Sequence, residues 1–138
     1  MSMGPEQRIE SRERAVMAET QGNFRWVLLR HELPDRTWHY DWMIEQEGNE
    51  RLVCFRVMVR VDELTPGARF EGERLADHRR AYLEYEGEIS GGRGRVTRVT
   101  AGACGGWREG DVDASVVMGA KKVVGRVKRG AVWEFEVG

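Results

Sequence analysis

Residues 37–45 read TWHYDWMIE, and this stretch decides the class of fold. Successive side chains of a β-strand point to opposite faces of its sheet, so an alternating stretch has two chemically different faces. One face here is apolar and consists of Trp38, Tyr40, Trp42 and Ile44. His39 and Asp41 share the opposite face. The pattern predicts a strand that is anchored by its aromatic side chains and presents a histidine and an aspartate.

Segments with the same two-residue period continue along the chain and are separated by glycine-bearing turns. They cover residues 24–31, 38–45, 51–61, 82–89, 94–100, 113–118, 121–128 and 131–137. Strands spaced by roughly ten residues are typical of all-β folds. We therefore predict a small antiparallel β-barrel of about eight strands with short helical turns, one of them within ERLADHRRAY at residues 73–82.

The first part of the chain has a different composition. Residues 1–22 contain few apolar side chains and no amphipathic period, which predicts a flexible or partly helical tail. Residues 23–138 are then expected to form one domain, because a chain of 138 residues suffices for a single core.

Composition also restricts the environment of the protein. The chain has no apolar run of about eighteen residues and no secretory signal near its start, so we expect a cytoplasmic protein that does not span a membrane. Cys54 and Cys104 are far apart and form no C-x-x-C motif, which predicts reduced thiols.

Residues 89–130 carry nine basic and three acidic side chains. Such a segment suits contact with phosphates, although a solvated strand face is the commoner reason for it.

A metal site is one interpretation of the polar strand face. His39 and Asp41 are two residues apart, or roughly 7 Å along a strand. His31 ends the preceding strand, and a short loop returns the chain beside it. Two imidazoles and one carboxylate from adjacent strands suit manganese, zinc or iron(II) and leave positions open for water or substrate. The alternative is that each histidine is an ordinary surface or hydrogen-bonded residue.

His78 and Tyr82 form a second candidate pair. They are four residues apart in ADHRRAYLEYEG, so a helical turn would bring them together. Both side chains are able to donate hydrogen bonds to an anionic oxygen. The alternative is a capping histidine and a core tyrosine.

Five motifs occur in an order that matches a known family. They are RH at 30–31, HYDW at 39–42, DHRRAYLEYEG at 77–87, SGGRGRVTRVTAG at 90–102 and GAKKVVGRVKRG at 119–130. On these motifs, residues 24–138 resemble the 3′-phosphoesterase domain of bacterial DNA ligase D, a small β-barrel that uses manganese to trim ribonucleotides and phosphates from 3′ ends at DNA breaks.

The resemblance implies roles for individual residues. His31, His39 and Asp41 match the metal ligands of the family, His78 matches a histidine that contacts phosphate, and Tyr82 matches a tyrosine of the same site. The implied cofactor is manganese, with zinc or another divalent cation as a substitute. The implied substrates are 3′-phosphate or 3′-ribonucleotide ends of DNA, in DNA repair. The expected protein is a free-standing monomer whose partners are nucleic-acid ends and a separate DNA ligase.

The chain also departs from the family. The family arginine that follows two residues after the aspartate is Met43 here, and a methionine cannot hold a phosphate with two hydrogen bonds. Arg56 is the candidate replacement that would offset phosphate charge, and Arg60 and Arg74 are further candidates.

Two other functions fit the same residues. The first is a catalytically silent module that keeps the metal-site barrel and binds nucleic-acid ends or another partner. The second is an iron oxygenase that uses His39, Asp41 and His78 as a facial triad. We rank the oxygenase last, because it leaves His31 and the ordered motifs unexplained.

Overall fold

The computed structural model describes residues 22–138, so all but the last residue of the predicted tail at residues 1–22 lies outside the described part of the chain. Its strands form one antiparallel sheet in the order β5-β6-β1-β2-β3-β4-β10-β9-β8-β7. The strands are β1 (Phe24–Glu32), β2 (Trp38–Gln46), β3 (Asn49–Val57), β4 (Arg69–His78), β5 (Gly87–Glu88), β6 (Arg95–Cys104), β7 (Arg108–Glu109), β8 (Ala114–Met118), β9 (Lys121–Arg129) and β10 (Val132–Val137). Two short 3₁₀ helices, η1 (Val61–Glu63) and η2 (Arg80–Leu83), complete the described elements.

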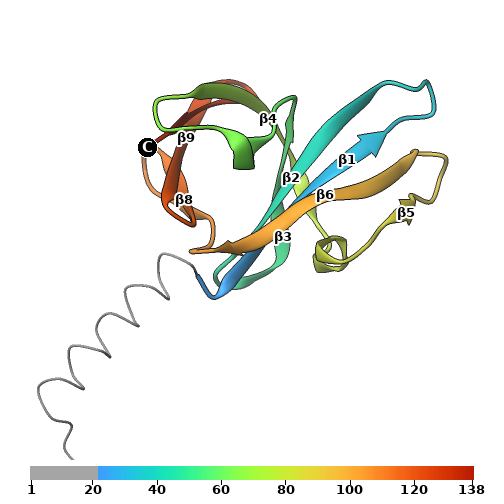
Figure 1. Cartoon of the computed structure of the whole chain (residues 1–138), viewed down its shortest axis with the longest axis horizontal. Helices are drawn as coiled ribbons and strands as arrows, with labels where there is room; N and C mark the ends of the chain where they lie inside the picture. The colour runs from blue at the N-terminus through green and yellow to red at the C-terminus, as the bar shows by residue number, and fades with distance from the viewer. Residues whose placement is uncertain (1–21) are drawn as a thin grey trace, which may run out of the picture.

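The prediction of an antiparallel all-β fold is confirmed, but the prediction of a closed barrel is wrong. The sheet has ten strands rather than about eight, and within residues 22–138 no ladder joins its edge strands β5 and β7. The sheet curls strongly, as Figure 1 shows, and the backbone N–H of Trp107 donates to the carbonyl of Glu45, 2.9 Å away. The two edge strands have only two residues each, which is too short to form a closing ladder.

The main core fills the inside of the curled sheet. It joins β1, β2 and β3 to β4, β8, β9 and β10 through a cluster that includes Trp42, Phe55 and Phe135. The rings of Phe55 and Phe135 meet edge to face with centroids 5.0 Å apart. Gly125 permits this packing, because a Cβ at that position would lie 2.5 Å from the ring of Phe135.

A second apolar cluster lies on the other face of β1, β2 and β3, against η2. Its buried members are Val27, Leu29, Met43, Leu52, Cys54, Leu83 and Val96. These three strands are therefore covered on both faces, which explains why their sequences contain near-continuous apolar runs. The segment that carries η2 and β5 lies beside this end of the sheet in Figure 1.

Strand β4 corrects a further expectation. The helical turn predicted within residues 73–82 is limited to η2, and Glu73–His78 continues β4. The segment predicted as a strand at 82–89 is mostly η2 and a turn, with only Gly87 and Glu88 in a strand. The core-facing positions of β4 are Phe70 and Gly72, and glycine gives no apolar signal in a sequence pattern.

Residues 22–138 contain no helix with the length and apolar character needed to cross a membrane. Cys54 and Cys104 are free and buried, in agreement with the prediction of reduced thiols.

Candidate metal centre

Strand register places the three predicted metal ligands side by side. His31 of β1 lies opposite His39 of β2 in the antiparallel ladder, and Asp41 follows two residues later. Residues at alternate positions of one strand share a face, so all three side chains leave the same face of the sheet. This is the face of the second apolar cluster, where Leu29 and Met43 continue the rows of His31 and Asp41.

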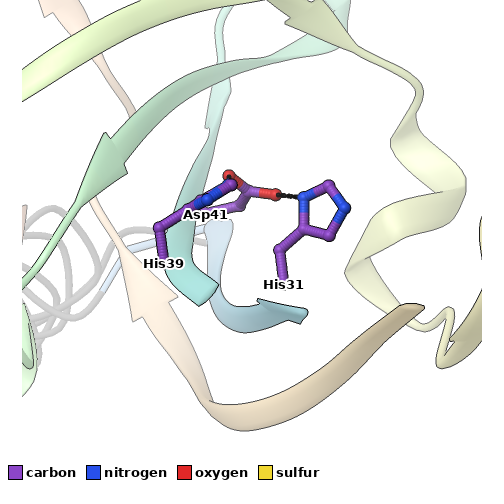
Figure 2. Close-up of side chains that lie close together, drawn as sticks. All are labelled: His31, His39 and Asp41. Atoms are coloured by element: carbon purple, nitrogen blue, oxygen red, sulfur yellow. Dashed lines mark hydrogen bonds and ion pairs between the residues drawn. The ribbon is translucent and has the colours of Figure 1, made fainter. Parts of the chain in front are cut away.

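The three side chains form a compact group, shown in Figure 2. One ligand atom from each of His31, His39 and Asp41 lies within 4.8 Å of the other two. The Nδ1 of His31 is hydrogen-bonded to Oδ2 of Asp41 at 3.0 Å, and Nε2 of His39 lies 2.9 Å from Oδ1. His39 and Asp41 are buried, with 4% and 3% of their surfaces exposed. A buried carboxylate requires positive or hydrogen-bonding partners, and of the two imidazoles only that of His31 makes a hydrogen bond to Asp41.

Two atoms of this group have unused hydrogen-bonding capacity. Although His39 Nε2 and Asp41 Oδ1 are close, their orientation makes no hydrogen bond, and neither atom has another partner among residues 22–138. Buried polar atoms without partners are rare in folded proteins and often mark a missing ion or water. An imidazole nitrogen and a carboxylate oxygen are both ordinary ligands of divalent transition metals. The donor set therefore fits a divalent cation.

The outer side of His31 also has the arrangement expected of a metal ligand. Its Nε2 lies 2.7 Å from the backbone carbonyl of Arg93. A carbonyl only accepts hydrogen bonds, so Nε2–H is the donor there. Nδ1 faces Asp41 and is a hydrogen-bond donor to it only when it also carries a proton; without that proton it offers a lone pair to a metal. Histidines that bind metals usually donate their second N–H to a carbonyl or carboxylate, which fixes the ring.

A glycine turn between β5 and β6 brings that carbonyl to His31. Gly91, Gly92 and Gly94 all adopt positive φ, and a Cβ on Gly94 would lie 1.9 Å from the carbonyl oxygen of Glu32. Only glycine allows this approach of the turn to the end of β1. The glycine-rich segment of the sequence thus determines where the Arg93 carbonyl lies.

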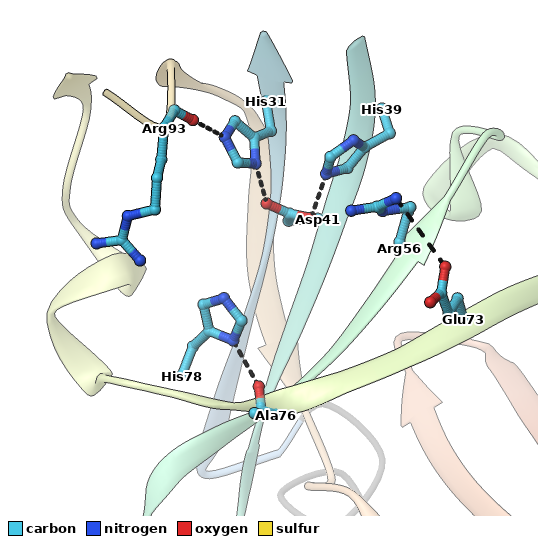
Figure 3. Close-up of polar contacts among 8 residues, drawn as sticks. All are labelled: His31, His39, Asp41, Arg56, Glu73, Ala76, His78 and Arg93. Carbon is cyan, nitrogen blue, oxygen red and sulfur yellow. Dashed lines mark hydrogen bonds and ion pairs between the residues drawn. The ribbon is translucent and has the colours of Figure 1, made fainter. Parts of the chain in front are cut away.

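His78 and Tyr82 lie close together on the edge of the same site. Their ring centroids are 5.6 Å apart, although His78 ends β4 and Tyr82 belongs to η2. The Nδ1 of His78 donates to the carbonyl of Ala76 at 2.7 Å, which leaves Nε2 available to a ligand. In Figure 3 the His78 ring points from the end of β4 toward the triad of His31, His39 and Asp41.

A cavity of about 230 Å³ joins these residues. His31, Asp41, His78 and Tyr82 all line it. Met43 also lines the cavity, although only 1% of its surface is exposed. The cavity therefore brings His31 and Asp41 together with His78 and Tyr82, whereas His39 does not line it, and Met43 occupies the position of the family arginine.

Arg56 has a different position from the other candidates. It is the ladder partner of Asp41 on β3 and so leaves the same face of the sheet, on the His39 side of Asp41 in Figure 3. It does not line the cavity, and its guanidinium lies 4.0 Å from the carboxylate of Glu73. Of the other arginines considered, Arg60 pairs with Asp62, and Arg74 lies over the rings of Phe55 and Trp133 in the main core.

The iron-oxygenase hypothesis required His39, Asp41 and His78 to form one metal site, and the structure does not group these three residues. The three-ligand group contains His31 in place of His78, whose ring is hydrogen-bonded to its own strand.

Two arginines of the cavity, Arg51 and Arg79, were not predicted as site residues, and Arg93 was predicted only as part of the basic segment at residues 89–130. Arg51, Arg79 and Arg93 come from β3, from the residue before η2 and from the turn before β6. The only sequence signals were the position of Arg79 directly after His78 and that of Arg93 among glycines. Their convergence depends on the sheet order, which local patterns do not encode.

The basic segment at residues 89–130 is divided between two parts of the fold. Arg93 lies beside the triad, whereas Lys121–Arg129 form β9, four strands away from β2 in the sheet. Lys128 of β9 pairs with Glu71 of β4. The charge of β9 is therefore partly neutralised by neighbouring strands.

Comparison of the chain with models of protein families finds no match, and no curated protein is significantly similar to it.

Proposed function

We propose that the protein is a metal-dependent phosphoesterase that processes 3′-phosphate or 3′-ribonucleotide ends of DNA. One observation carries the proposal: two potential metal ligands, His31 and Asp41, line the same cavity as His78 and Tyr82. These residues are the ones that resemble the site of the ligase D phosphoesterase domain, and they come from segments far apart in the sequence. A role in DNA repair and manganese as the preferred metal follow from that resemblance.

The triad holds the metal in this proposal. A divalent cation bound there supplies positive charge for a phosphate oxygen and lowers the pKa of water. Asp41 provides the anionic ligand, and the Arg93 carbonyl keeps the His31 ring oriented with Nδ1 toward Asp41. Burial of His39 and Asp41 excludes bulk water from one side of the site.

His78 and Tyr82 act on the phosphoryl group. With Nδ1 donating to Ala76, a His78 ring that carries both protons donates its Nε2 proton to the leaving oxygen and becomes the neutral Nδ1–H form, or hydrogen-bonds a phosphate oxygen through Nε2–H. The hydroxyl of Tyr82 donates to a second phosphate oxygen. Arg56 is placed to offset charge on the other side of Asp41, once its guanidinium leaves Glu73.

A 3′-end assay tests the proposal. Metal-stripped protein is incubated with a labelled primer-template bearing a 3′-phosphate or one 3′-ribonucleotide, with and without manganese. We expect manganese-dependent removal of the end group, which Asp41→Asn reduces by about 100-fold or more because the anionic ligand is lost. Asp111→Asn is the matched control, since Asp111 is an exposed aspartate in the loop before β8. Equal activity of Asp41→Asn and wild type would refute the assignment of the site.

Met43 supports a second candidate function. It lines the cavity at the family arginine position and packs in the second apolar cluster, so the site lacks that guanidinium. A catalytically silent module would retain the metal and bind nucleic-acid ends without turnover. The same labelled ends separate the phosphoesterase from the silent module when binding is measured beside product formation. Salt-sensitive binding of the labelled DNA end without any product identifies the silent module.

A further inference from the structure

The arginines of the described chain differ in whether they have a carboxylate partner. Those within 4.0 Å of a carboxylate are Arg25, Arg30, Arg56, Arg60, Arg69, Arg74 and Arg80. Arg51, Arg79 and Arg93 line the cavity beside the triad, and within residues 22–138 none of the three has such a partner. Within the described residues these three guanidinium groups therefore have no ion-pair partner, and they outnumber the two aspartates of the same cavity, Asp41 and Asp77.

The two carboxylates of the same cavity contact groups other than these arginines. Asp41 contacts His31 and His39, and Asp77 accepts a hydrogen bond from Nε2 of Gln46 at 3.2 Å. Three arginines line the cavity against two aspartates, and this excess of positive charge favours an anion there. Guanidinium groups bind phosphate oxygens through paired, charge-assisted hydrogen bonds.

The size of the cavity limits the anion. Its volume of about 230 Å³ is below the roughly 300–1,000 Å³ of pockets that enclose a drug-sized ligand. A phosphate group with part of its sugar fits this space, whereas a base pair does not.

We propose that Arg51, Arg79 and Arg93 form a subsite for a terminal phosphate group. These arginines come from other segments of the chain. They supply the guanidinium groups that the site lacks because Met43 stands at the family arginine position. Arg93 contributes twice, because its carbonyl lies 2.7 Å from Nε2 of His31 and the residue also lines the cavity. Its Nε donates to the carbonyl of Ser90 at 2.8 Å, so only its terminal N–H groups are offered to a phosphate. In Figure 3 this side chain runs from the turn beside His31 toward the level of His78. The role of this subsite in catalysis rests on the proposed function. A subsite for a terminal phosphate favours a 3′-phosphate over a 3′-ribonucleotide as the substrate. Binding to the subsite requires neither metal nor turnover.

Calorimetric titration of metal-free protein with inorganic phosphate, in a chelator at fixed ionic strength, tests the subsite. We expect saturable binding at one site, weakened by about tenfold in each of Arg51→Gln, Arg79→Gln and Arg93→Gln, because each removes charge-assisted hydrogen bonds. Arg129→Gln is the matched control, since Arg129 is exposed on β9 and has no carboxylate partner within residues 22–138. The control is expected to bind phosphate as the wild type does.

Three outcomes would overturn the subsite: no saturable binding by the wild type, unchanged binding by the three variants, or equal weakening by Arg129→Gln. All four arginines are exposed, and circular dichroism checks that each variant is folded. The result is separable from the 3′-end assay. Arginine-dependent binding without turnover retains the subsite and refutes the phosphoesterase, whereas turnover without arginine-dependent binding does the reverse.

Discussion

Asp41 occupies an environment that few carboxylates tolerate. It is almost completely buried, and its two oxygens face His31 and His39 from neighbouring strands. An unpaired charge at this depth would cost several kcal/mol, so the imidazoles are needed for folding as well as for any ligand. The alternation in TWHYDWMIE was sufficient to predict that His39 and Asp41 share a face. Their burial was not predictable, because it depends on the packing of η2 against that face of the sheet.

The two cysteines give a prediction at the residue scale. Burial raises the pKa of the Cys54 thiol well above its usual value, with the Asp41 carboxylate adding to the effect, and burial raises the pKa of Cys104 to about 11. Because the thiolate is the reactive form, neither cysteine is expected to react with a thiol reagent in native protein at pH 8. Both should react after unfolding in urea. Rapid labelling of either cysteine in native protein would contradict the burial described here.

Gly94 gives a second prediction at this scale. A methyl group on Gly94 clashes with the Glu32 carbonyl, so we expect Gly94→Ala to displace the Arg93 carbonyl from His31, destabilise the fold by about 1–3 kcal/mol and weaken metal binding. Gly92→Ala is the matched control. Gly92 also has positive φ, but a Cβ there meets nothing within 4 Å. Urea unfolding and metal titration of the two variants provide the comparison, and equal metal affinity would argue against a role for the turn.

Among the structural elements, η2 depends on one buried acid. Glu45 of β2 accepts a hydrogen bond from the backbone N–H of Arg25 at 2.6 Å, and its other oxygen pairs with Arg80 of η2 at 2.6 Å. These contacts tie η2, which carries Tyr82, to β1 and β2. Glu45 is 5% exposed, so its carboxylate is shielded from water.

We expect Glu45→Gln to destabilise the protein by about 1–3 kcal/mol, because the buried, charged acceptor of the Arg25 backbone hydrogen bond and of the Arg80 ion pair becomes a neutral one. Arg80→Gln should cost less, about 0–1 kcal/mol, since more than half of the Arg80 side chain is exposed. Urea unfolding of the two variants measures the difference. A larger effect of Arg80→Gln would show that the ion pair, rather than the buried acceptor, holds η2.

The elements also show where sequence patterns succeed. Strands β1, β2, β6, β8, β9 and β10 have alternating or continuous apolar residues, and their positions were predicted from these patterns. Strand β4 was missed because Gly72 occupies a core-facing position and Arg74 lies across aromatic rings instead of an apolar side chain. The proximity of His78 and Tyr82 was anticipated from their spacing, although a strand end and a 3₁₀ helix produce it.

At the scale of the whole molecule, the main core joins the two halves of the curled sheet. Phe135 of β10 contacts the rings of Trp42, Phe55 and Phe70. We expect Phe135→Ala to destabilise the fold by about 3–5 kcal/mol, because the remaining aromatic rings cannot fill the space left. Val127→Ala, at an exposed position of β9, should change stability by no more than about 0.5 kcal/mol. Similar urea midpoints for both variants would contradict this core.

The assembled site shows what the sequence could not predict. The ladder of β1 and β2 was foreseeable from a short hairpin, and it brings His31, His39 and Asp41 together. The arginines of the cavity converge only because β6 pairs with β1 and the segment carrying η2 crosses the same face of the sheet. The open sheet was not foreseeable either, since the number of strands does not determine whether a sheet closes.

Direct measurement of metal binding tests the central claim. Metal-stripped protein is dialysed against manganese or zinc, and the bound metal is counted by mass spectrometry alongside Asp41→Asn and the exposed control Asp111→Asn. We expect one ion per chain for the wild type and for Asp111→Asn, and almost none for Asp41→Asn, because both orphaned ligand atoms belong to the site around Asp41. No bound metal in the wild type, or equal metal in Asp41→Asn, would contradict a metal centre at His31, His39 and Asp41.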